Sequence, residues 1–238
     1  MNPTTTTQVD PTRVEHRVSL AVSTVIFALR PHPSTGRETL WLPLVRRIRE
    51  PYKGAWALPG GPLEADEDLA ASARNTLERT TGLTPNYLEQ LYSFGEVDRS
   101  PADRVVSIVY WALVRPDEVA RAVASIELQS DNVEWFVADE VPQLAFDHNR
   151  IVEYALGRLR AKITYSPIAH AFLNPEFTLA ELREVHEAVL RKPLDPANFR
   201  RQVLASQTIV PTGTCVTGTS HRPPALYRFD PAATKERS

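Results

Sequence analysis

The chain has 238 residues, of which 42% are hydrophobic and 24% charged, an ordinary globular composition with room for one large or two modest domains. Its single cysteine, Cys215, excludes an intrachain disulfide framework and a zinc site built from several cysteines, and fits a reducing compartment. Residues 1–12 lack the apolar core of a signal peptide and Val18–Leu29 is too short to span a bilayer, so we expect a cytoplasmic protein with no membrane partner.

The charges divide the chain into two parts. From Arg160 onward there are 11 basic and 7 acidic residues, a net +4, while the preceding 159 residues carry 16 and 22, a net −6. An acidic body with a basic appendage is typical of proteins that meet nucleic acid, although a solvated basic tail gives the same pattern. We expect a first domain over residues 15–160 and a second over 161–238. Residues 1–14, rich in Thr and Pro, should form a disordered leader because they bury too little apolar surface.

The first ordered elements should be two strands. β-branched and aromatic residues are dense in Val18–Leu29 and again in Thr39–Arg46, with a polar loop between them. A basic cluster follows just before Trp56, made of Arg46, Arg47, Arg49 and Lys53. Such a cluster is either a solvated loop or a set of permanently charged, forked donors for a phosphate-bearing ligand.

The stretch from Gly60 to Leu83 predicts a strand end, an acidic loop and a helix. A glycine pair and four acidic residues come first, and Leu69, Ala73 and Leu77 then recur every fourth residue until Gly82 ends the helix. This layout resembles the Nudix box, in which a glycine and a glutamate precede a helix with the pattern Arg-Glu-apolar-x-Glu-Glu-x-Gly.

The frame of that box is kept here, but its catalytic glutamates are not. The residues that match are Gly61, Glu67, Leu77, Gly82 and Leu83. The three glutamate positions hold Thr76, Arg79 and Thr80, and Asn75 stands at the arginine position. In Nudix hydrolases those glutamates share one helix face and hold divalent cations that activate water on a pyrophosphate. We therefore expect a Nudix fold kept for binding, with no catalytic residues, metal or cofactor. The alternatives are a chance match by a surface helix and a hydrolase with rearranged metal ligands.

Further strands and a helix complete the first domain. Tyr87–Val114 predicts two strands around a polar turn, the clearest being Val105–Val114, and Val133–Val137 predicts a short strand. A helix is expected over Asn149–Arg160, preceded by His148, for which capping or packing is commoner than catalysis at such a place. In a Nudix fold the basic loop and the glycine pair border the ligand groove. The residues expected to bind a nucleotide diphosphate are Arg46, Lys53, Trp56, Gly60, Gly61, Glu67, Arg99 and Arg104.

The last part of the chain predicts a helix-turn-helix. Tyr165 opens a short helix. Thr178 should cap a second helix with Glu181 as its capping-box partner, and Asp195 should cap a third, in which Pro196 occupies the first turn. Helix, tight turn and helix is the plan of many DNA-binding domains.

The third helix has a packed side and a polar side. Phe199 and Val203 define the packed side, and the residues that project away from it suit base edges or phosphates. Ile209–Phe229 predicts two short strands joined by a polar tip, a wing that can lie along the DNA backbone. The expected DNA contacts are Thr178, Lys192, Asn198, Arg200, Arg201, Gln202, Thr219, His221 and Arg222.

The combination of a degenerate Nudix box with this C-terminal domain resembles the Nudix-related transcriptional regulators (NrtR) of bacterial NAD metabolism. The resemblance covers about Val18–Phe229, and its most specific parts are the helix segment NFRR and the closing RPPALYRF. It implies an α/β (α+β) Nudix sandwich with a C-terminal winged helix-turn-helix domain. It also implies a homodimer that binds a palindromic double-stranded DNA operator near NAD-biosynthesis genes and senses ADP-ribose or a related nucleotide, so we expect a ligand-responsive repressor.

Two other functions stay open from the sequence. A Nudix pyrophosphatase that hydrolyses ADP-ribose or a related nucleoside diphosphate would use its basic part for something else, such as dimerisation. A winged helix that serves only to bind another protein would show no salt-dependent affinity for DNA.

Overall fold

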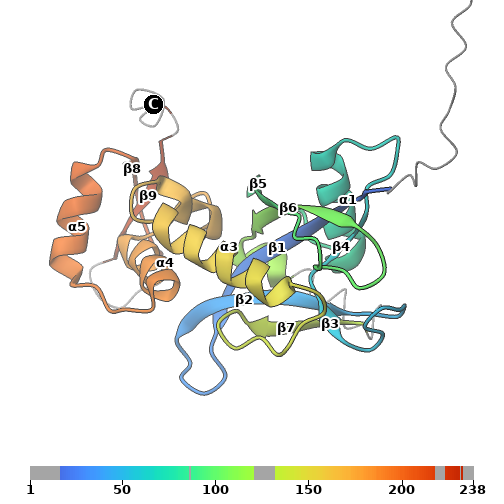
Figure 1. Ribbon diagram of the computed structural model, residues 1–238. Coiled ribbons are helices and arrows are strands. Elements are labelled where there is room, and N and C mark those ends of the chain that lie inside the picture. Colours follow the sequence, from blue (N-terminus) through green and yellow to red (C-terminus); the bar gives the residue numbers. More distant parts are fainter. Residues whose placement is uncertain (1–16, 86, 121–131, 218–222, 231, 233–238) are drawn as a thin grey trace, which may run out of the picture.

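The computed structural model describes residues 17–85, 87–120, 132–217, 223–230 and 232, so the expected leader over residues 1–14 lies outside the described residues. A sheet with helices beside it forms the larger part, and a group of helices with a hairpin forms the smaller part (Figure 1). The helices are α1 (Leu69–Thr81), α3 (His148–Lys162), the 3-10 helix η1 (Pro167–Phe172), α4 (Leu179–Leu190) and α5 (Pro196–Ala205). Within the described ranges, no helix has the length and apolar character needed to cross a membrane.

One mixed sheet forms the body of the first domain. Its strand order is β3-β2-β1-β6-β5, with β4 beside β1 and β7 beside β2, and β1 and β6 run parallel. The strands are β1 (Ser19–Pro31), β2 (Glu38–Arg46), β3 (Trp56–Ala57), β4 (Gly60–Pro62), β5 (Tyr87–Phe94), β6 (Val105–Leu113) and β7 (Val133–Val137). The strands expected from the sequence are therefore all present.

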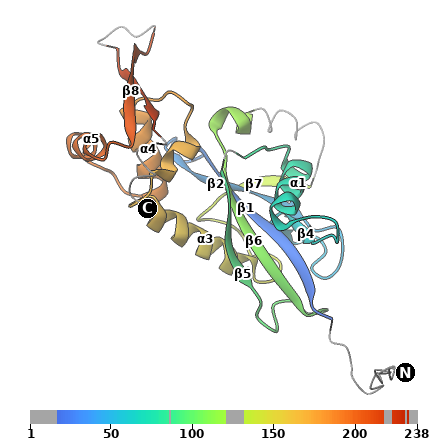
Figure 2. The same cartoon turned by 90° about the horizontal axis from the view of Figure 1, so that it is seen from above.

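The strand β1 lies in the centre of this sheet and is buried on both faces. Val22–Leu29 are buried without interruption, as expected for a strand with helices on both sides. Because side chains alternate along a strand, Ile26 belongs to the same core cluster as Leu77 of α1, while Phe27 shares a cluster with Ile151 of α3. The sheet is thus sandwiched between α1 and α3, which lie on opposite sides of it in Figure 2.

The helix of the Nudix-like box, α1, begins and ends as its sequence predicts. An oxygen of the Asp68 carboxylate accepts a hydrogen bond from the N–H of Ala71 at 2.7 Å, which satisfies one free donor of the first turn. Gly82 ends the helix in the left-handed region with φ 65°, and its N–H donates to the carbonyl oxygen of Glu78.

The helices of the second domain also follow their capping signals. The Thr178 hydroxyl accepts from the N–H of Glu181 while the Glu181 carboxylate accepts from the N–H of Thr178, so both halves of the capping box form. Asp195 caps α5 by accepting from the N–H of Asn198. The expected wing is an antiparallel hairpin of β8 (Ile209–Cys215) and β9 (Ala225–Phe229).

The two domains share one apolar core. A single cluster of buried residues contains Leu42 of β2, Leu159 of α3 and Val185 of α4, and α4 packs against β2. The helix α3 runs from the sheet into the second domain and ends at Lys162, two residues beyond the expected border at 160. The second domain therefore packs against the sheet, and buried side chains connect the two domains.

Candidate functional site

The loop between β2 and β3 presents two cations beside an aromatic ring. Arg46, the last residue of β2, lies opposite Trp56 of β3. The guanidinium of Arg46 is 6.0 Å from the centroid of the Trp56 ring, and its Nε donates to the carbonyl oxygen of Gly54 at 3.2 Å. Lys53 is exposed in the same loop. The structure thus brings together three of the residues expected to bind a ligand, at a corner where an anionic, ring-bearing molecule has charge and stacking partners.

The two glycines of β4 have different surroundings. Gly60 pairs with Ser23, and a Cβ at Gly60 would lie 2.7 Å from the carbonyl oxygen of Val22, so close contact with β1 requires glycine there. A Cβ at Gly61 would meet no atom within 4 Å. Gly60 is therefore explained by strand packing, whereas the backbone of Gly61 has open space beside it.

In the box helix, Asn75 stands at the arginine position of the Nudix pattern, and Glu67 matches the glutamate that precedes the helix. The Asn75 side-chain amide donates to the Glu67 carboxylate at 2.9 Å. At the positions where the Nudix pattern has glutamates, Thr76 is buried, Thr80 is half-buried and Arg79 is exposed. Among the residues that the structure describes, no group of three or more His, Cys, Asp or Glu side chains is placed to hold a metal ion.

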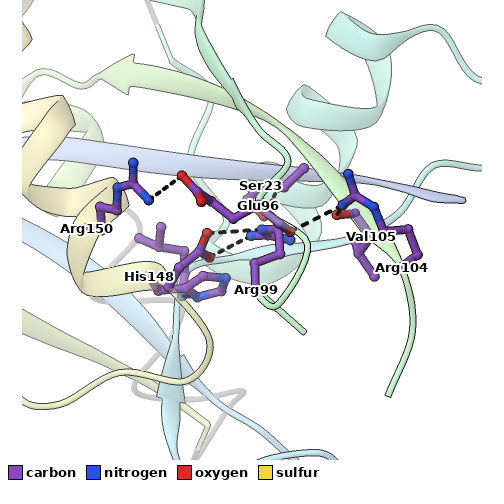
Figure 3. Close-up of polar contacts among 10 residues, drawn as sticks. Ser23, Glu96, Arg99, Arg104, Val105, His148 and Arg150 are labelled. Carbon is purple, nitrogen blue, oxygen red and sulfur yellow. Dashed lines mark hydrogen bonds and ion pairs between the residues drawn. The ribbon is translucent and has the colours of Figure 1, made fainter. Parts of the chain in front are cut away.

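The polar turn between β5 and β6 is fastened by its two arginines, as Figure 3 shows. Arg99 forms an ion pair with Asp147 at 2.7 Å, and only 4% of its side chain is exposed. Arg104 donates to three carbonyl oxygens of the turn, those of Gly95, Glu96 and Val105. Because both guanidiniums already have partners, the geometry assigns Arg99 and Arg104 to bracing the fold and gives no support to their expected contact with a ligand.

His148 is a packing residue, as its place at a helix start suggested. Its Nδ1 accepts a hydrogen bond from the N–H of Leu58 at 3.0 Å, which ties the start of α3 to the segment between β3 and β4. Burial lowers the pKa of His148 to about 4, with an opposing effect from Asp147 and a smaller lowering by Arg99. The imidazole is therefore neutral near pH 7 and accepts the Leu58 hydrogen bond.

The polar face of α5 is open to solvent. Phe199, on the inner side of the helix, is buried. On the outer side, the Arg201 guanidinium donates a hydrogen bond of 2.6 Å to the side-chain oxygen of Asn198. The expected DNA contacts exposed on or beside this helix are Lys192, Asn198, Arg200, Arg201 and Gln202. Asn198 and Arg201 lie on the outer side of α5, Arg200 and Gln202 lie on its two flanks, and Lys192 lies in the turn from α4.

The remaining expected DNA contacts are Thr178, at the start of α4, and three residues of the wing. Thr178 is 8% exposed, and its hydroxyl both accepts from the N–H of Glu181 and donates to the carboxylate of that residue. The geometry therefore assigns Thr178 to the helix cap and not to a DNA contact. Thr219, His221 and Arg222, expected at the tip of the wing, lie outside the described residues.

Comparison with known proteins matches both halves of this architecture. Residues 169–229 match the NrtR DNA-binding winged helix domain, and residues 21–155 match the NUDIX domain. The chain is 33% identical over 200 residues to the ADPR responsive transcriptional repressor NtrR of Acinetobacter baylyi, across 82% of this chain and 78% of that protein. The chain belongs to the NrtR family. The predicted fold class, a Nudix domain with a C-terminal winged helix, is confirmed.

The solved structures of a second NrtR protein include a complex with DNA and a complex of its Nudix domain with ADP ribose. NrtR of Shewanella oneidensis complexed with a 27mer DNA matches with a TM-score of 0.76 and 34% identity, over 91% of this chain and 95% of that chain. Its Nudix domain complexed with ADP ribose matches with a TM-score of 0.50 and 30% identity, over 63% and 94%. The ADP-ribose pyrophosphatase of Methanocaldococcus jannaschii is 33% identical over 110 residues, across 46% of this chain and 62% of that protein.

Sequence reasoning missed the charged residues that join the two NrtR domains. Asp139 pairs with Arg160 at the end of α3 and with Arg191 at the end of α4. These three residues lie far apart in the chain and belong to no motif, so no local spacing could have found them. Opposite charge alone would have allowed many other pairings.

Proposed function

We propose that this NrtR protein is a transcriptional repressor that binds operator DNA through α5 and the wing, and that ADP-ribose or a related nucleotide in its Nudix domain regulates that binding. The observation that carries this proposal is the exposed polar face of α5, which bears Asn198, Arg200, Arg201 and Gln202. The relative in Acinetobacter baylyi, named an ADPR responsive transcriptional repressor, supports it. From the family resemblance we propose genes of NAD metabolism as targets and the cytoplasm as the place of action.

The side chains on α5 have the chemistry of DNA readers. An arginine donates two parallel hydrogen bonds to guanine, and asparagine or glutamine pairs similarly with adenine in the major groove. The exposed Lys192, in the turn before α5, is placed to meet a phosphate while the hairpin of β8 and β9 follows the backbone. One short helix and a wing contact few phosphates, so specific binding requires two copies on a palindromic operator.

The corner formed by Arg46, Lys53 and Trp56 has the chemistry of a nucleotide diphosphate site. A guanidinium and an ammonium group neutralise a diphosphate, and an indole ring offers an aromatic face to a base. Gly61 follows this corner in the chain, in β4, which pairs with β1, and the open space beside its backbone leaves room for close approach. The ADP-ribose complex of the Shewanella oneidensis Nudix domain supports ADP-ribose as the effector.

Hydrolysis of ADP-ribose is the second candidate activity, because part of the chain is similar to the Methanocaldococcus jannaschii pyrophosphatase. We propose binding without turnover, since Thr76, Arg79 and Thr80 stand where a Nudix enzyme has glutamates. A hard dication needs several carboxylate oxygens, and Arg79 adds repulsion at that place. An assay with Mg²⁺ or Mn²⁺ should show negligible release of AMP from ADP-ribose; efficient metal-dependent release would establish the enzyme instead.

The proposed repressor is tested by a mobility shift on DNA from the protein's own promoter region. We expect a retarded band that weakens with rising salt, because phosphate contacts release counterions, and that is lost when ADP-ribose is added. The absence of a retarded band at low salt would contradict the DNA-binding function. A band that ADP-ribose leaves unchanged would contradict the effector.

A further inference from the structure

The carboxylate of Asp139 forms ion pairs with two arginines. Arg160 belongs to the linking helix α3, and Arg191 belongs to the second domain. Asp139 follows β7 by two residues, and its two oxygens lie 2.8 and 2.7 Å from Nη2 of Arg160 in α3. Nη1 of Arg191 lies 3.4 Å from the same carboxylate. Only 14% of the Asp139 side chain is exposed, against 30% for Arg160 and 60% for Arg191. We call these three residues the Asp139 joint.

Both arginines lie at the end of α4, where the turn to α5, the proposed recognition helix, begins. Nε of Arg160 donates to the carbonyl oxygen of Val189 in the last turn of α4, at 3.0 Å. Arg191 is the residue after α4 and adopts a left-handed backbone with φ 55°, where the chain changes direction toward α5. The turn is also fixed at its far end, because the N–H of Leu194 donates to the Glu187 carboxylate at 2.8 Å.

The other side of the joint leads to the proposed effector corner. The strand β7 pairs with β2, and its Phe136 ring meets the Trp56 ring edge to face with centroids 5.2 Å apart. The N–H of Ala138, directly before Asp139, donates to the carbonyl oxygen of Leu40 in β2. These contacts form a continuous path from Trp56 and β2 to the segment that carries the Asp139 carboxylate.

Open space lies beside the joint, at the end of α4. A cleft of about 960 Å³ lies between the first domain and the end of α4, with Asp139 and Arg191 in its wall. The same cleft is lined by Glu38 of β2 and Glu184 of α4, and burial together with the charge of Glu184 raises the pKa of Glu38. Opposite charges thus meet at Asp139, while the like-charged Glu38 and Glu184 both line the cleft between the domains.

We propose that Asp139, Arg160 and Arg191 are positioning residues that transmit nucleotide binding in the Nudix domain to the orientation of α5. The inference rests on the proposed function and names the means of its regulation. In this role the joint orients α5 from the end of α4. Loss of the joint therefore uncouples the two binding sites while each site keeps its own ligand contacts.

The test compares the coupling ratio, which is the operator Kd with saturating ADP-ribose divided by the operator Kd without it. Two variants break the joint, Asp139→Asn and Arg191→Gln. Glu96→Gln is the matched control, because it breaks the Glu96–Arg150 ion pair of 2.7 Å at the opposite end of α3. We expect the ratio to move toward 1 by about fivefold or more in both joint variants and to stay unchanged in the control, with the affinity for ADP-ribose preserved in all three.

The outcomes separate this inference from the proposed function. A wild-type ratio of 1 would contradict the proposed regulation by ADP-ribose itself. A wild-type ratio far from 1 that Arg191→Gln retains would overturn the role of the joint, and this variant decides the question even if Asp139→Asn fails to fold. A ratio reduced equally by Glu96→Gln would also overturn it, because the effect would then come from α3 as a whole.

Discussion

Arg99 and Asp147, 48 residues apart in the chain, form a two-point ion pair in which Nε and Nη2 of the arginine lie 3.0 and 2.7 Å from the two carboxylate oxygens. Asp147 directly precedes α3, so the pair fastens the turn between β5 and β6 to the start of the helix that leads to the DNA-binding domain. Only 14% of the Asp147 side chain is exposed.

Asp147→Asn is expected to lower the free energy of unfolding by about 3–5 kcal/mol, because it leaves a buried guanidinium without its counter-charge. Urea denaturation measures the loss. Arg150→Gln is the control, since the Arg150 and Glu96 side chains are 62% and 53% exposed and water screens their attraction. A loss as large in the control as in Asp147→Asn would contradict the bracing role assigned to Arg99.

His148 is expected to make the protein less stable in mild acid. Burial lowers the pKa of His148 from 6.5 to about 4, so below pH 6.5 the unfolded chain binds a proton that the folded chain does not. The free energy of unfolding should therefore fall between pH 6.5 and about 4, by up to about 3 kcal/mol from this residue. His186 of α4 adds to the trend, because burial lowers its pKa to about 4 as well.

The variant His148→Gln separates the two histidines. A glutamine oxygen can still accept the hydrogen bond from Leu58, but the side chain does not titrate. Urea unfolding at several pH values should show a shallower decline below pH 6.5 than in the wild type. An unchanged decline would mean that His148 is not the group responsible.

The elements of both domains could be predicted because their signals are local. The spacing from Thr178 to Glu181 and the glycine at position 82 each determine a helix end through nearby backbone groups, and the density of β-branched and aromatic residues in β1 favours a strand. Side-chain partners depend on the folded neighbourhood. Arg99 stands in a polar turn that is typical of ligand contacts, yet the fold brings Asp147 to it, and no spacing in the sequence indicates that pairing.

Arg201→Ala is expected to weaken specific operator binding by about 1–3 kcal/mol, because Arg201 is exposed on the outer face of α5, where we propose a contact to a base or a phosphate. Fluorescence anisotropy with labelled operator measures the change, and circular dichroism checks the fold. Arg158→Ala is the matched control, an exposed arginine on α3 and not on α5. Wild-type affinity in the Arg201 variant would remove this residue from the reading face.

The protein is expected to bind its operator as a twofold dimer held together by the Nudix domains. A dimer presents two α5 helices to half-sites that lie about 34–36 Å apart or a multiple of that spacing. Sedimentation of the protein, alone and with a palindromic or half-site DNA, gives the stoichiometry. A monomer that binds one half-site with full affinity would show that the second copy is not needed.

The proposed regulation predicts linkage between the binding of ADP-ribose and the binding of operator DNA. Isothermal titration calorimetry with ADP-ribose, once into the free protein and once into the protein–operator complex, measures whether each ligand affects the other. If ADP-ribose weakens operator binding, the bound operator must weaken ADP-ribose binding by the same factor, with a coupling of about 1–3 kcal/mol. We predict a lower affinity for ADP-ribose in the complex than in the free protein. Equal affinities in the two titrations would contradict the claim that the Nudix domain regulates the DNA-binding domain.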